Sequence, residues 1–146
     1  MNYEEAIQLL SYHSGYSEDV ENPKWAKGFL GQLRPFSGEL YEDNFKEVMD
    51  IIETIAVEIR GKTIDQEIIA MLYDISTVPR LWAFDPEGML RRNNLISEDQ
   101  LTILNDWLIR ICEAISYLLN GEGFTVEQIL TGYGEQLPKY FSGKLT

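Results

Sequence analysis

Three observations predict that this chain folds as an all-α domain, a single compact bundle of about five to seven helices, two of them long. Apolar residues recur at spacings of three and four in two long segments. Helix-capping signatures precede several of the helical segments. No segment alternates apolar and polar residues with the β-branched content of a strand. Each apolar stripe lasts only about three heptads, which favours an intramolecular bundle over a coiled coil.

Two short helices are expected near the N-terminus. Asn2 can cap the first, with Glu5 in the position of a capping box. The run 14–17 then interrupts the helix, since it contains serine and glycine. Asn22 followed by Pro23 has the pattern of an N-cap and a proline at the first helical position, which predicts a second short helix.

The segment 39–60 has the clearest helical pattern. Its apolar stripe is formed by Tyr41, Phe45, Val48, Ile52, Ile55 and Ile59. Acidic residues fall on the opposite side: Glu39, Asp43, Glu47, Asp50 and Glu53. Gly61 follows as a natural helix end. This helix is therefore expected to have one apolar face and one acidic face.

A further helix is expected to begin at Thr63, with Gln66 in the capping-box position, and to end before Pro79. Asp85 and the proline after it predict a short turn that runs through Arg92.

The second long helix is predicted to start after Ser97, with Gln100 completing a capping box, and to end at Asn120. Within it, Asp106 and Arg110 have the spacing of a helical ion pair. A last short helix should follow, capped by Thr125 and Gln128. Residues 133–146 contain glycine and proline and are expected to form an irregular C-terminal tail of the single domain 1–146.

The composition limits the class of partner. The chain has 146 residues, with 24 acidic against 12 basic side chains and a formal net charge of -12. A phosphate backbone needs a cationic face, so duplex nucleic acid is not expected as a partner, whereas a basic protein fits. The single cysteine, the lack of a signal-like start and the lack of a run of about 18 apolar residues predict a cytoplasmic protein that does not enter a membrane.

The inventory of catalytic residues is poor. His13 is the only histidine and Cys112 the only cysteine, so a zinc site has too few ligands. Glu39 with Glu42, and Glu47 with Asp50, have the local spacing of magnesium ligands, but both pairs lie on one continuous helix and are interpreted as a solvated face. We expect His13 to sit favourably at a helix C-terminus and Cys112 to be a small core residue. No catalytic residue, metal or cofactor is assigned, and a non-enzymatic protein is favoured.

Three features are candidates for recognition. The first is the pair Arg91 and Arg92, with Arg80, Trp82 and Phe84 nearby, which could bind an anion or clamp its own loop. The second is the acidic face with Glu39, Asp43, Glu47 and Asp50, which is a docking surface or simply solvated. The third is the aromatic tail with Tyr133, Tyr140 and Phe141, which presents aromatic rings to a partner or docks on the bundle. All three tryptophans are expected to anchor packing between helices.

Three functional hypotheses remain open. The favoured one is a non-enzymatic protein–protein interaction domain, in its most specific form an acidic inhibitor or immunity-type protein that covers a basic partner. The second is an enzyme or ligand-binding domain with a metal–carboxylate or anion site. The third is a homo-oligomeric structural domain that buries a leftover apolar stripe.

Overall fold

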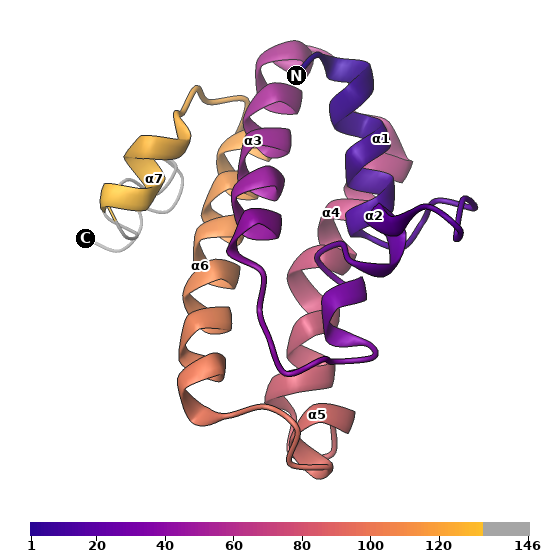
Figure 1. The fold of residues 1–146 in the computed structure, drawn as a ribbon. Helices are drawn as coiled ribbons and strands as arrows, with labels where there is room; N and C mark the ends of the chain where they lie inside the picture. The colour runs from indigo at the N-terminus through magenta and orange to yellow at the C-terminus, as the bar shows by residue number, and fades with distance from the viewer. Residues whose placement is uncertain (133–146) are drawn as a thin grey trace.

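The computed structural model of the chain describes residues 1–132, and their regular secondary structure is helical, with no strand among them (Figure 1). The predicted all-α class, with two long helices, is confirmed. The elements are α1 (Tyr3–His13), α2 (Pro23–Ala26), the 3₁₀ turn η1 (Gly31–Leu33), α3 (Glu42–Ile59), α4 (Gln66–Pro79), the π-helical turn η2 (Arg80–Phe84), α5 (Met89–Arg92), α6 (Glu98–Asn120) and α7 (Val126–Gly132).

Four helices close into a bundle. α3 packs against α1 and α6, and α4 packs against the same two helices. α3 and α6 run in one direction, while α1 and α4 run in the other (Figure 1). The core between them is fully buried, as shown by the 0% exposure of Leu10, Ile52, Ile75, Leu104 and Ile111. Among residues 1–132, no helix combines the length and apolar character needed to cross a membrane.

Most of the predicted caps form. The side chain of Asn2 accepts a hydrogen bond from the Glu5 N–H at 2.8 Å, and Glu5 returns the contact. Ser97 and Gln100 make the same reciprocal pair at the start of α6. α6 ends at Asn120 and is followed by Gly121, whose φ of 69° is the left-handed conformation that glycine adopts without strain.

Arg110 on α6 forms hydrogen bonds with α7. Arg110 Nε donates to Asp106 Oδ2 at 3.0 Å, as the spacing predicted. Arg110 Nη1 also donates to the carbonyls of Ile129 and Leu130, at 2.7 and 2.8 Å. Ile129 and Leu130 belong to α7, so the guanidinium holds this helix against α6.

Two predicted helix starts are wrong. The first long helix begins at Glu42, because Tyr41 has extended backbone angles, and Glu39 therefore lies in the preceding loop. The next helix begins at Gln66 and is capped by Asp65, whose carboxylate accepts from the Glu67 N–H at 3.0 Å. An aspartate is a better N-cap than a threonine, which is the physical reason that Thr63 does not start the helix.

Pro79 was expected beyond α4 but is its last residue. Proline has no N–H and its ring clashes with the carbonyl four residues earlier, so a regular helix cannot continue through it unchanged. The chain instead widens into the π turn η2, closed by a bond from the Asp85 N–H to the Arg80 carbonyl at 3.0 Å. Such widened turns often occur at functional sites.

Candidate functional site

His13 is buried and joins three parts of the fold. It is 4% exposed, at the end of α1. Its Nδ1 accepts from the Phe29 N–H at 2.9 Å, and its Nε2 lies 2.9 Å from Glu47 Oε1. Because Nδ1 accepts, the ring hydrogen is on Nε2 and donates to the carboxylate. His13 does lie in the last turn of α1, at the expected helix C-terminus. Its buried ring also connects α1 to α3 and to the segment before η1.

Glu47 belongs to this buried arrangement and not to an open acidic face. Lys24 Nζ lies 3.6 Å from the same Oε1 atom that His13 contacts. The hydrogen bond from His13 and the charge of Lys24 hold the pKa of Glu47 below its usual range, against the opposing effect of partial burial. Glu47 also lines a small cavity of about 280 Å³, whose wall includes Lys27 and Asp43.

The other predicted acidic residues do not lie on one helix face. Glu39 is exposed in the loop before α3, whereas Asp43 and Asp50 are exposed on α3 itself. Partial burial and the neighbouring carboxylates Glu53 and Glu47 raise the pKa of Asp50. Within residues 1–132, no group of three or more His, Cys, Asp or Glu side chains is arranged to hold a metal ion.

The predicted arginine and aromatic residues do not form one patch. Arg91 and Arg92 are exposed on α5, and the guanidinium of Arg91 lies 3.9 Å from Glu98, an exposed contact of the kind that adds little stability. The cation over the Trp82 ring is Arg34, at 5.6 Å from the ring centroid. Arg80 lies over Phe84 instead. The tail candidates Tyr133, Tyr140 and Phe141 lie outside the described residues.

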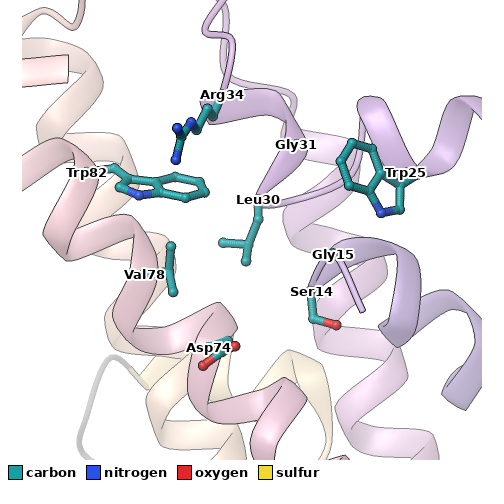
Figure 2. Close-up of a pocket in the computed structure, with 9 residues that line it drawn as sticks. All are labelled: Ser14, Gly15, Trp25, Leu30, Gly31, Arg34, Asp74, Val78 and Trp82. Atoms are coloured by element: carbon teal, nitrogen blue, oxygen red, sulfur yellow. The ribbon is translucent and has the colours of Figure 1, made fainter. Parts of the chain in front are cut away.

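A cavity opens between two tryptophans, and we call it the two-tryptophan pocket (Figure 2). Its volume is about 460 Å³, within the range of about 300–1,000 Å³ typical of ligand pockets. Trp82 and Val78 come from η2 and the end of α4, and Trp25 faces them from α2. Leu30 lies between these two walls, and all four side chains are apolar or aromatic. The middle of the pocket is therefore hydrophobic.

Short irregular segments build this pocket. Gly15 has a φ of +74°, which turns the chain sharply after α1 and brings Ser14 and Gly15 into the lining. Gly31 approaches the main chain of α2 so closely that a Cβ would collide with the carbonyl oxygens of Trp25 and Ala26. The indole N–H of Trp25 has no hydrogen-bond partner within residues 1–132, which is uncommon for a buried donor.

Opposite charges mark the two ends of the pocket. Figure 2 shows Arg34 at one end and Asp74 at the other, with Leu30 and Val78 between them. Tyr16 Oη donates to Asp74 Oδ2 at 2.9 Å, and this bond, with partial burial and the negative charge, raises the pKa of Tyr16. Arg34 is exposed and forms no ion pair with a carboxylate of the described residues. The pocket can therefore bind an anion at one end and a cation or hydrogen-bond donor at the other.

No motif in the sequence marks this pocket. Arg34 and Asp74 were not predicted as binding residues, since they lie on separate elements and match no motif. Trp107 does anchor packing, being 6% exposed and stacked on Phe45 at 5.4 Å. Trp82 also packs against the core, as expected, but both it and Trp25 are only half-buried and line the pocket. Cys112, expected in the core, is exposed on α6.

No protein-family model, no curated protein sequence and no solved structure matches this chain. The features of the chain that bear on its function are the geometry and chemistry of the two-tryptophan pocket and the net negative charge.

Proposed function

We propose that this chain is a non-enzymatic protein-binding domain whose partner, a basic protein, docks over the two-tryptophan pocket. The observation that supports this is the pocket itself, where Trp25, Trp82 and Arg34 surround an apolar cavity. Tryptophan and arginine are the residues most enriched among binding hot spots. A pocket with aromatic walls and a few polar groups is also the usual form of a recognition site.

The charge of the chain supports a basic partner. A net charge of -12 attracts a cationic protein over long range and raises the rate of encounter. Asp43 and Asp50 are exposed carboxylates that add to this field. In its most specific form the proposal is an acidic inhibitor of the immunity type. We place the interaction in the cytoplasm, because the only cysteine of the sequence is a free, exposed thiol, which a reducing compartment preserves.

The test begins with the identity of the partner and ends with a matched pair of variants. The tagged chain is used at low salt to capture proteins from its native extract, and a captured basic protein is then purified and its Kd measured. Trp82→Ala should weaken binding at least about tenfold, as expected for a hot spot. Leu81→Ala is the control, because Leu81 is 60% exposed in the same turn and does not line the pocket. Equal loss in the two variants, or none in either, would refute the pocket as the docking site.

Association kinetics test the electrostatic part separately. Replacing Asp43 and Asp50 by lysine should slow association at low ionic strength and leave dissociation nearly unchanged, because exposed charges act mainly on encounter. An association rate that is unchanged by the substitutions and by the salt concentration would exclude electrostatic steering.

A ligand-binding domain is the second candidate, and Arg34 is the observation that favours it. An arginine without a carboxylate partner in the described part of an acidic protein is suited to a small anion. A small anionic metabolite that raises the melting temperature of the wild type but not of Arg34→Gln would support this alternative.

A further inference from the structure

The two-tryptophan pocket has complementary features for both charges of one ligand. The Arg34 guanidinium over Trp82 presents a planar set of N–H donors at one end. Asp74 lies at the other end, where Tyr16 is its one hydrogen-bond donor among residues 1–132. A carboxylate can accept about four hydrogen bonds, so Asp74 retains acceptor capacity. The matching occupant has an anion and a cation joined by an apolar stretch.

Building on the proposed function, we propose that the pocket binds the C-terminal lysine or arginine of the partner protein. The terminal α-carboxylate pairs with Arg34. The aliphatic stem of the terminal side chain lies on Leu30 and Val78, between the two indoles. Its cationic head reaches Asp74 at the far end of the pocket (Figure 2).

Each part of this ligand is complementary to a feature of the pocket. An arginine fork binds a carboxylate through two parallel hydrogen bonds, which makes the terminal carboxylate a better match than a neutral main chain. The methylene stem of lysine or arginine gains from contact with apolar side chains while its charge stays near a carboxylate. Indole faces also attract cations.

Other peptide ligands leave one end of the pocket without a partner. A lysine inside a chain brings a cation to Asp74 but no anion to Arg34, which would repel it. An internal aspartate or glutamate brings an anion to Arg34 but no cation to Asp74. The net charge of -12 also disfavours an acidic ligand. Unlike these internal residues, a C-terminal lysine or arginine supplies both charges on one flexible unit.

The test uses the full chain and three short peptides. The probe is N-acetyl-Gly-Gly-Lys with a free C-terminal carboxylate, titrated by calorimetry and by the fluorescence of the pocket tryptophans. The same peptide with a C-terminal amide lacks the anion, and the norleucine peptide lacks the cation. Each should bind at least about tenfold more weakly than the probe, the effect of losing one charge-assisted contact.

Two variants connect each preference to its residue. Arg34→Gln should abolish the preference for acid over amide and keep the preference for lysine over norleucine. Asp74→Asn should do the reverse, and it retains an oxygen for the Tyr16 hydrogen bond. Arg92→Gln is the matched control, since Arg92 is exposed on α5 outside the pocket and should change neither preference. Circular dichroism verifies that each variant is folded.

The failures of the two proposals are distinguishable. Equal binding of acid and amide, no binding of the probe at millimolar concentration, or tighter binding of free L-lysine than of the probe would each overturn this inference. If Trp82→Ala nevertheless loses the captured partner, the proposed function stands without it. If Trp82→Ala keeps the partner at full affinity, both proposals fail.

Discussion

Replacing His13 by leucine tests whether the hydrogen bonds of the buried histidine hold α1 against α3. Leucine has a similar bulk and is apolar, so the substitution removes two hydrogen bonds without opening a large cavity. The Phe29 N–H loses its acceptor, and Glu47 loses the donor 2.9 Å away. We expect the free energy of unfolding to fall.

The magnitude follows from the two contacts. Phe29 is 0% exposed, and a buried N–H left without a partner costs about 1–3 kcal/mol. The bond to Glu47 adds about 1.5 kcal/mol, the low end for a charged acceptor, because this carboxylate is 31% exposed and can regain water. The apolar leucine offsets part of this loss. The net expectation is about 2–4 kcal/mol, or roughly 6–15 °C in Tm for a domain of this size.

Urea unfolding followed by circular dichroism measures this change, with Glu47→Gln as the matched control. Glutamine keeps an oxygen to accept from His13 Nε2 and removes only the charge, so it should cost about 1 kcal/mol or less. A loss for His13→Leu of no more than that of Glu47→Gln would show that the hydrogen bonds of the imidazole do not hold these elements together.

Three further predictions concern stability. The pKa of Glu47 in the folded state is lowered from 4.5, so the stabilisation by its carboxylate is present above that pH and is lost as the pH falls through the lower folded value. The stability of Glu47→Gln should therefore approach that of the wild type in acid, which urea unfolding at a series of acidic pH values can test. Gly31→Ala should destabilise by about 1–3 kcal/mol through collision with the Trp25 carbonyl, whereas Gly123→Ala meets only the end of a flexible side chain and should be nearly neutral; similar urea midpoints for the two would contradict this. Trp107→Ala should cost about 3–5 kcal/mol by opening a cavity in the core, and a thermal melt close to that of the wild type would be the opposite result.

The parts of the fold that depend on local rules could be predicted from the sequence. The caps at Asn2 and Ser97 and the end at Gly121 involve residues within four positions of one another, so the pattern contains all the information. The apolar stripes likewise specify which face of α3 and α6 is buried. The failures came where two local signals competed, as when Asp65 displaced Thr63 as the cap of α4.

The candidate site could not be predicted, because its residues come from segments that are distant in the sequence. The contact between Arg34 and Trp82, and that between Tyr16 and Asp74, exist only after α1 and α4 pack side by side. The same reason explains Glu47, which by spacing belongs on an acidic face. Its partner His13 is brought to it by the packing of α1 on α3.

The location of the pocket follows from the irregular segments that surround the bundle. The four helices of the bundle satisfy their own backbone hydrogen bonds and fill the space between them with apolar side chains. α2 and η1 are short segments with no apolar stripe of their own, and Pro79 prevents α4 from continuing as a regular helix. Two tryptophans are consequently held only half-buried across a cavity that the core does not fill. Because departures from regular local rules tend to concentrate at functional sites, this is the part of the described chain where a binding site is most expected.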